Sequence, residues 1–256
     1  SRNANDRFDE AFWERRVRYA WEYRKTVMGE DTDCCRIIFG EADSFPGLTV
    51  DRFHDLLVTQ TLSLGMELRK EMIFPLIYKV LTEDGQTIRG IYERNDVAIR
   101  AHEGLAENKG WFHLEGVPVP ESPRTAIVEN GVEYAVDVEN GQKTGFFLDQ
   151  KYNRRAVARL AAGHTVLDCF THTGSFALNA AKGGAARVTA ADISAEAIAM
   201  AQRNAQRNNL TNMDFLCEDT FELLPRLEKE GHPYDFIILD PPAFTKARRT
   251  VENAMR

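Results

Sequence analysis

From about residue 145 onward, short apolar runs that suit β-strands alternate with amphipathic stretches that suit helices. The expected strands are His164–Cys169, Arg187–Ala191, Met213–Cys217 and Tyr234–Leu239, and the expected helices between them are Ser175–Lys182, Ala195–Asn208 and Thr220–Glu228. Alternation of this kind predicts a parallel sheet with helices on both faces. This feature restricts the second half of the chain to an α/β, Rossmann-like fold.

Each of the four expected strands has an acidic residue at or next to its carboxyl end. Asp168 ends the first strand and Asp192 follows the second, while Glu218-Asp219 follows the third and Asp240 the fourth. Ligands of open parallel sheets bind beyond the carboxyl ends of the strands. We therefore expect these carboxylates to line one ligand site.

The loop after the first strand distinguishes between nucleotide cofactors. Asp192 lies 24 residues after Asp168, a spacing typical of a carboxylate that accepts hydrogen bonds from ribose hydroxyls. Gly174 allows close backbone approach at the start of a helix, which suits a ligand carboxylate. The loop contains no G-x-G-x-x-G, and Asp168 would repel a pyrophosphate. The cationic sulfonium and ammonium groups of S-adenosylmethionine (SAM) tolerate carboxylates, so the pattern favours SAM over a dinucleotide.

The fourth strand leads into Asp240-Pro241-Pro242. Two prolines fix the backbone where the transferable methyl group is expected, so Asp240, Pro241 and Phe244 are our candidate catalytic residues. Amino-group methyltransferases usually place an aromatic residue directly after the prolines. Ala243 occupies that position here and Phe244 follows it, which disfavours methylation of an amino group.

The first half of the chain has a different pattern. We expect an N-terminal helix in residues 1–33, a small central α/β domain in 34–123, a β-hairpin connector in 124–144 and a SAM-binding domain in 145–256. The central strands are expected at Arg36–Phe39, Leu48–Phe53, Leu56–Thr61, Gly90–Arg94 and Val97–Arg100, with a helix over Glu67–Leu81. Asn130-Gly131 is a strong hairpin signal. The basic amphipathic N-terminal helix either packs with a solvated charged face or contacts phosphates.

Composition narrows the class of protein. A net charge of −7 argues against a protein coated in basic charge, although it does not exclude a local basic patch. The four cysteines form no CxxC pair or plausible metal set, so we expect reduced thiols, no metal and a cytoplasmic location. The most apolar run, Met72–Leu81, is far shorter than the roughly 20 residues that span a bilayer, so we expect no membrane association.

Several motifs together carry a resemblance to a known family. They are Gly40-Glu41-Ala42-Asp43, Phe45-Pro46-Gly47-Leu48-Thr49-Val50-Asp51-Arg52, the block from Gln142 through Gln150 with Asn153-Arg154, the Val166–Leu178 loop, Asp192-Ile193-Ser194 and Asp240-Pro241-Pro242-Ala243-Phe244. In these motifs the chain resembles the RlmI-type class I methyltransferases, which make 5-methylcytosine in large-subunit ribosomal RNA.

The resemblance implies a central α/β domain, a connecting hairpin and a Rossmann-like class I methyltransferase domain, with ribosomal RNA as the partner. It also implies that Asp149, Gln150 and Arg154 help to frame the cofactor pocket, although a structural junction between hairpin and helix would use them equally well. The full set of candidate cofactor-binding residues is Asp149, Gln150, Arg154, Asp168, Phe170, Thr171, Thr173, Gly174, Asp192, Ile193, Asp219 and Asp240.

The family's reaction uses a cysteine thiolate that adds to carbon 6 of the pyrimidine before carbon 5 attacks the methyl group. In the family this nucleophile lies on a strand after the Asp-Pro-Pro strand, which places it beyond Arg256. Cys169 lies behind the expected SAM loop, where a packing role is favoured, and we assign no nucleophile.

Both ends of the sequence differ from the family pattern. Family members usually carry an RNA-binding PUA domain before the first helix and further strands after the fourth. A sheet that stopped at Phe236–Leu239 would leave an apolar strand as an unprotected edge. We therefore expect the chain to be a fragment, or a further segment or a second copy in a homodimer to cover this edge.

Two other functions remain open. Relatives with similar SAM loops methylate guanine, and a SAM-binding or RNA-binding module without turnover would fit the missing nucleophile. Lys246, Arg248 and Arg249 could meet RNA phosphates or form a solvated charge cluster.

Overall fold

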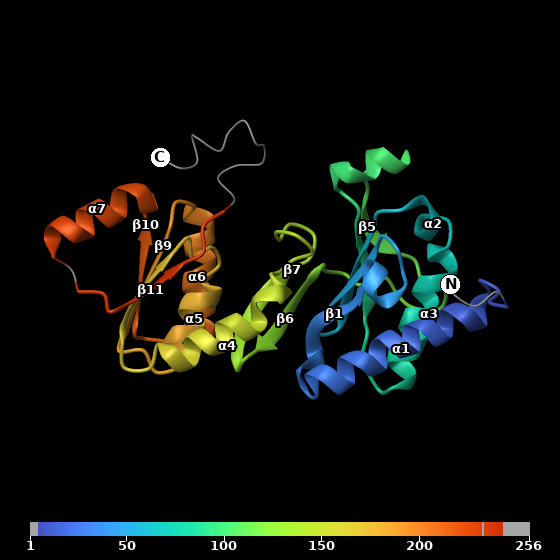
Figure 1. Ribbon diagram of the computed structural model, residues 1–256, viewed down its shortest axis with the longest axis horizontal. Coiled ribbons are helices and arrows are strands. Elements are labelled where there is room, and N and C mark those ends of the chain that lie inside the picture. Colours follow the sequence, from blue (N-terminus) through green and yellow to red (C-terminus); the bar gives the residue numbers. More distant parts are fainter. Residues whose placement is uncertain (1–4, 232, 243–256) are drawn as a thin grey trace. The chain divides into compact units, whose positions relative to one another are not determined.

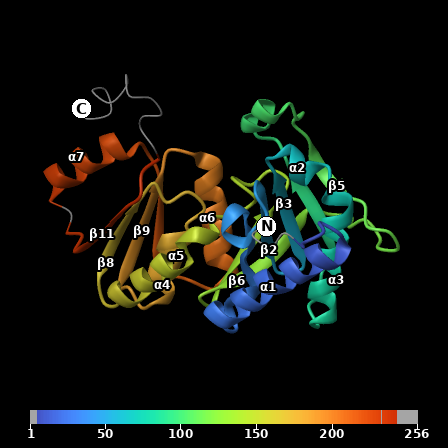
Figure 2. The same cartoon turned by 45° about the vertical axis from the view of Figure 1, so that its right-hand side comes forward.

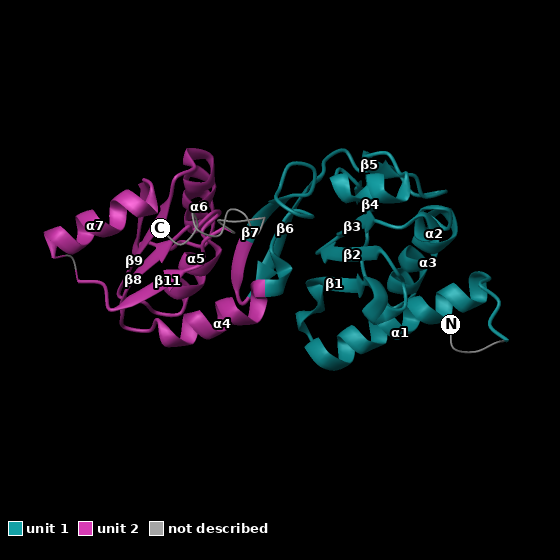
Figure 3. Ribbon diagram, turned by 45° about the horizontal axis from the view of Figure 1, so that its top comes forward, with its two compact units in different colours: residues 1–129, 134–149 teal, residues 130–133, 150–256 magenta. Residues whose placement is uncertain are grey.

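The computed structural model describes residues 5–231 and 233–242. These residues form two compact units, coloured separately in Figure 3. Unit 1 comprises Ser1–Glu129 and Tyr134–Asp149, and unit 2 comprises Asn130–Glu133 and Gln150–Arg256.

Unit 1 opens with helix α1 (Glu10–Met28), as its apolar periodicity predicts. Asp9 caps the helix by accepting the N–H of Phe12 at 3.0 Å. The apolar stripe, which includes Trp13, Val17 and Trp21, is buried against helix α3 and strand β1. Burial of this stripe makes the helix part of the unit's core.

A mixed sheet forms the centre of unit 1. Its strands, in spatial order, are β1 (Cys34–Phe39), β2 (Leu48–Phe53), β3 (Leu56–Thr61), β4 (Gly90–Arg94) and β5 (Lys109–Phe112). Neighbouring strands are antiparallel except β3 and β4, which are parallel and joined through helices α2 (Leu64–Glu67) and α3 (Lys70–Glu83). One face of the sheet packs on α1 and α3 through a core that includes Ile38, Val50, Leu57, Ile77 and Ile91.

Unit 1 also contains short 3-10 turns and most of a β-hairpin, whose tip belongs to unit 2. The turns are η1 (Asp31–Asp33), η2 (Gly40–Asp43), η3 (Ala98–Glu103) and η4 (Leu148–Gln150). Strands β6 (Arg124–Glu129) and β7 (Val132–Asp137) pair as the predicted hairpin. Asn130 and Gly131 at its tip have φ of 53° and 78°, as a tight hairpin turn requires.

Two expectations for the central domain were wrong, and one strand was not predicted. Val97–Arg100 is not a strand, because Ala98–Glu103 forms a 3-10 helix in which the buried Arg100 donates to Ala106 O and pairs with Glu67. The strand β5 was missed. The helix expected over Glu67–Leu81 is two helices, α2 and α3, which break at Leu68 and Arg69.

Unit 2 contains the predicted parallel sheet. Its strands are β10 (Met213–Cys217), β9 (Arg187–Asp192), β8 (Thr165–Cys169) and β11 (Phe236–Leu239), in that spatial order. Helices α4 (Lys151–Leu160), α5 (Ser175–Lys182) and α6 (Ala195–Arg207) cover one face, and α7 (Thr220–Glu230) covers the other (Figures 1 and 2). Successive residues alternate between the two cores, since Val166 faces α5 and Leu167 faces α7.

Strand β11 lies at the end of the sheet and pairs with β8. Within residues 5–231 and 233–242, no strand pairs with its other edge. Ile238 is buried in the core under α4 and α5, whereas Ile237 and Leu239 point to the opposite face and are 56% and 60% exposed. In the same residues no helix is long and apolar enough to cross a membrane.

Candidate functional site

Asp168, at the end of β8, lies beneath the loop that follows it. Its carboxyl is almost wholly buried, and its Oδ2 accepts the Thr171 hydroxyl at 2.6 Å and the Ala177 N–H at 3.0 Å. Burial raises the pKa of Asp168 to about 7, with smaller contributions from the charges of Asp240 and Asp192, and the two hydrogen bonds oppose this rise. The carboxyl therefore joins the loop to the first turn of α5.

The loop after β8 has an unusual backbone. Phe170, His172 and Gly174 all have positive φ, at 59°, 52° and 84°. The Thr171 N–H donates to Ala191 O at 2.9 Å, so the loop is held to the end of β9. A Cβ on Gly174 would lie 2.9 Å from the Cβ of Ala201, so the loop reaches α6 only because residue 174 is glycine.

Asp192, at the end of β9, holds the loop from the other side. Its Oδ2 accepts the His172 N–H at 2.8 Å and its Oδ1 accepts the Ser194 N–H at 2.9 Å. The carboxylate is half-buried, and the next residue, Ile193, is 69% exposed. Burial lowers the pKa of His172, which the charge of Asp192 partly offsets. Asp192 is thus oriented by two backbone amides and still reaches solvent.

The third strand end contributes a helix cap. Asp219 accepts the Phe221 N–H at 2.9 Å at the start of α7, and Glu218 pairs with Arg226 at 2.7 Å. Both acidic residues predicted at this edge therefore have structural partners, and Asp219 remains half-exposed. The fourth strand end places Asp240 and Pro241, both exposed, at the same sheet edge as Asp168.

The other candidate residues lie in different surroundings. Arg154 is buried, with its guanidinium 6.0 Å from the Phe176 ring centroid, and Gln150 accepts from Asn153 at 2.7 Å. Asp149 is the last residue of unit 1, where it pairs with Lys143 at 3.4 Å. Phe244, Ala243, Lys246, Arg248 and Arg249 lie outside the described residues.

Sequence reasoning missed one residue that supports the loop and the role of His172 within it. Asn204 of α6 is buried and donates its side-chain amide to Thr173 O at 3.3 Å. His172 supplies the N–H that Asp192 accepts. The signal for Asn204 was present, since it falls on the alanine-rich buried stripe of α6 where an amide needs a hydrogen-bond partner.

The arrangement suits a cationic adenosine cofactor. One sheet edge presents the half-buried carboxylate of Asp192, the exposed apolar side chain of Ile193 and the exposed residue Asp240. The Gly174 turn leads into α5, whose first turn favours a carboxylate. These residues fit SAM, which has two ribose hydroxyls, an aromatic base, a transferable methyl group and a carboxylate.

Comparison with known proteins agrees with this chemistry. Residues 110–256, more than half of the chain, match a family described as S-adenosylmethionine-dependent methyltransferase. Two relatives are named ribosomal RNA large subunit methyltransferase I. The one from Aeromonas salmonicida is 41% identical over 96% of this chain and 60% of its own length, and the one from Aliivibrio fischeri is 38% identical over 98% and 62%.

Solved structures agree in fold. A putative SAM-dependent methyltransferase from Streptococcus mutans has a TM-score of 0.76 and 26% identity, covering 94% of this chain and 60% of that one. A putative methyltransferase complexed with SAH also has a TM-score of 0.76, with 27% identity over 95% of this chain and 61% of that one. The chain thus spans about 60% of the length of the proteins it matches.

Proposed function

This chain belongs to the S-adenosylmethionine-dependent methyltransferase family, and from that membership we propose that it takes part in methyl transfer from SAM to large-subunit ribosomal RNA. The names of the relatives support the RNA substrate. SAM as the methyl donor is supported by the Asp192 carboxylate, which the backbone amides of His172 and Ser194 fix at the sheet edge. Such a substrate also favours a cytoplasmic place of action.

Each site residue has a proposed role. Asp192 accepts the ribose hydroxyls, Ile193 packs on the adenine, and Asp219 accepts from its amino group. Thr173 and Gly174 border the methionine end at the start of α5, where Gly174 lets the backbone approach closely. Bound SAM supplies an electrophilic methyl group, and Asp240 with Pro241 orients the base that receives it.

We propose carbon 5 of cytosine as the target, on the resemblance of the motifs to the RlmI-type enzymes. This chemistry needs a thiolate that adds to carbon 6. Cys169 does not suit that role, because it is fully buried and burial raises its pKa to about 11. Cys217 is exposed, but its Sγ lies 3.6 Å from Ile193 O, beside the proposed adenine position rather than the methyl end.

The outer edge of β11 is the proposed contact for a further segment or a second copy of the chain. The exposed Ile237 and Leu239 beside an edge strand support this proposal. We also propose the division into an N-terminal helix (1–33), a central domain (34–123), a hairpin connector (124–144) and a SAM-binding domain (145–256). Light scattering at several protein concentrations tests the second copy, and a monomer throughout would leave a further segment as the occupant.

Two measurements test the proposed function. Calorimetry should detect SAM binding to the chain as it stands, and the D192A variant should lose it while D214N does not, because Asp214 pairs with Arg187 away from the loop. Radiolabelled methyl transfer to large-subunit ribosomal RNA, assayed with the segment that supplies the thiolate and followed by nucleoside digestion, should give 5-methylcytidine. A methylguanosine product would support the guanine alternative. SAM binding without any product would support a binding module.

A further inference from the structure

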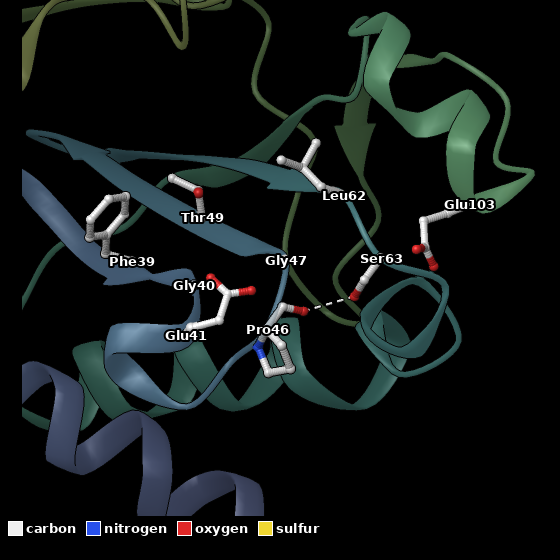
Figure 4. A pocket seen from close by; sticks show the side chains of 9 residues that line it. All are labelled: Phe39, Gly40, Glu41, Pro46, Gly47, Thr49, Leu62, Ser63 and Glu103. Carbon is white, nitrogen blue, oxygen red and sulfur yellow. Dashed lines mark hydrogen bonds between the residues drawn. The ribbon is translucent and has the colours of Figure 1, made fainter.

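Unit 1 contains a pocket at the ends of β1 and β2 that the cofactor site does not use. It encloses about 400 Å³, within the roughly 300–1,000 Å³ of ligand pockets, and is shown in Figure 4. Its walls come from the Gly40–Asp43 turn, the Pro46-Gly47 turn, Ser63 and Glu103. Residues of the two sequence motifs that begin at Gly40 and Phe45 therefore line this pocket.

The walls are held by specific contacts. Asp43 accepts the Phe39 N–H at 2.7 Å and pairs with Arg24 at 2.6 Å, which fixes the first turn. Ser63 donates its hydroxyl to Pro46 O at 2.8 Å, drawn as the dashed line in Figure 4. A Cβ on Gly47, whose φ is 80°, would lie 2.7 Å from the Ser63 Cβ. The pocket is thus a built feature of the fold.

An exposed aromatic ring borders the pocket. Phe39 pairs with Thr49 across β1 and β2, on the sheet face opposite α1 and α3, and is 56% exposed. The Arg36 guanidinium lies 5.2 Å from its ring centroid. An exposed aromatic ring on a sheet face is the usual stacking surface for an unpaired nucleobase.

Carboxylates face the same space. Glu41 is exposed, and among the described residues it forms no ion pair. Figure 4 shows its carboxylate between Phe39 and Pro46, with the Glu103 carboxylate on the far side near Ser63. Glu103 accepts the Leu64 N–H at 3.3 Å. Carboxylates repel phosphates but accept N–H donors, so the pocket suits the edge of a base and not the backbone of a nucleic acid.

We propose that this pocket binds an unpaired guanine of the RNA substrate, stacked on Phe39, with Glu41 accepting from its base edge. Guanine presents two adjacent N–H donors, at N1 and N2, which match the two oxygens of one carboxylate. An arginine side chain of a protein would satisfy the same carboxylate. Guanine fits better, because a pocket of about 400 Å³ is much larger than a single guanidinium needs.

The choice of RNA as the ligand rests on the proposed function. The test therefore measures RNA binding and does not depend on methyl transfer. Fluorescence anisotropy compares short single-stranded RNAs that carry one guanosine, inosine or adenosine in a uridine background. The wild-type chain should bind the guanosine RNA about tenfold more tightly than the adenosine RNA. Inosine lacks the 2-amino group and should fall between them.

Two variants locate the binding. In E41Q the guanosine and adenosine RNAs should bind with nearly equal affinity, because an amide offers one acceptor oxygen in place of two. E71Q is the matched control, since Glu71 is exposed on α3 outside the pocket and its loss should leave the preference unchanged. F39A should weaken all three RNAs, and F39Y should restore binding because it keeps the ring.

The outcomes separate the two hypotheses. Equal binding of guanosine and adenosine RNAs, or equal preferences in E41Q and E71Q, would overturn the guanine pocket. So would an arginine-rich peptide that binds in an E41-dependent way while the RNAs show no preference. SAM binding by the same variants checks their folding. A retained guanosine preference with no methyl transfer would contradict only the proposed function.

Discussion

Thr171 donates its hydroxyl to Asp168 across 2.6 Å, although the two residues are only three positions apart. The bond closes the loop after β8 on itself, and the same carboxylate oxygen accepts the N–H of Ala177 in α5. One buried carboxyl therefore joins the strand, the loop and the helix. The protonation of Asp168 then becomes a property of the whole loop.

Stability should depend on pH through Asp168. Its pKa is raised from 3.8 to about 7 by burial, so the folded chain keeps a proton that the unfolded chain releases. The stabilisation is complete below the unfolded pKa and is lost as pH rises through the folded value, over about pH 4 to 7. D168N keeps an acceptor oxygen but has no proton to lose, so its stability relative to wild type should rise with pH across this window.

Urea unfolding over this pH window, followed by circular dichroism, measures the difference. Tryptophan fluorescence gives a separate signal from unit 1, because Trp13, Trp21 and Trp111 all lie there and unit 2 has none. The fluorescence transition should be the same in D168N and wild type. A difference between the two proteins that is constant with pH would show that Asp168 does not titrate in this range.

The fold of unit 2 was predictable because its signals are local and repeated. The expected helix Ser175–Lys182 is α5, and the expected strand His164–Cys169 differs from β8 only at its first residue. Each strand alternates between two apolar cores, and each loop contains a turn or cap residue. Local pattern therefore determined the type of the expected helices and strands of unit 2 and their bounds to within two residues.

Unit 1 was harder to predict because long-range contacts determine its later elements. Strand β5 is four residues long and includes Gly110, so only its pairing with β4 makes it a strand. The Ala98–Glu103 turn has apolar residues that suit a strand, but Arg100 binds Thr61 O and Glu67 far away in sequence. No local pattern contains these partners.

The orientation of the site carboxylates was also beyond the sequence. All four strand ends are acidic, yet Asp168 points under the loop, Asp219 caps α7 and Asp192 binds two backbone amides while it remains half-exposed. A sequence shows that a carboxylate ends a strand. Whether it faces a ligand or a helix N-terminus depends on the amides that surround it.

Asp192 should determine SAM affinity through its two backbone partners. In D192N the amide nitrogen would face an N–H donor, so one bond to His172 or Ser194 is lost together with a ribose acceptor. We expect SAM binding to weaken by about tenfold or more, or at least about 1.4 kcal/mol. Calorimetry measures this, with D214N as the control that stays at the wild-type value. Similar affinities for both variants would remove Asp192 from the site.

Gly174 and Gly184 form a matched pair for the close approach of the loop. Both have positive φ, at 84° and 95°, so an alanine at either position costs about 1 kcal/mol in backbone strain. A Cβ at 184 has no neighbour within 4 Å, whereas a Cβ at 174 lies 2.9 Å from Ala201. G174A should therefore lower the free energy of unfolding by about 1–3 kcal/mol more than G184A does.

Circular dichroism during urea unfolding compares these two variants, and calorimetry compares their affinity for SAM. G174A should also bind SAM more weakly, because the loop must move away from α6, while G184A should bind it normally. Equal losses of stability would mean that α6 yields to the extra methyl group and that the contact does not position the loop.

Asn208, just after α6, should hold the tip of the β6–β7 hairpin in unit 2. Its side chain accepts the Glu133 N–H at 2.8 Å and donates to Glu133 O at 2.7 Å, as a neighbouring strand would. N208A loses both bonds and should cost about 1–3 kcal/mol, because the Glu133 amide is then left without this acceptor. Hydrogen exchange at the Glu133 amide should become faster by about tenfold or more.

Arg207 provides the control for this pair, because it contacts the Glu133 side chain and leaves the backbone bonds alone. The two side chains pair at 2.6 Å and each is about 40% exposed, at 42% and 41%. An exposed pair contributes less than about 1 kcal/mol, so R207Q should leave exchange at Glu133 nearly unchanged. If R207Q accelerated exchange as much as N208A, the ion pair and not the Asn208 amide would hold the tip. The tip's place in unit 2 would then depend on salt, which exchange at high ionic strength would reveal.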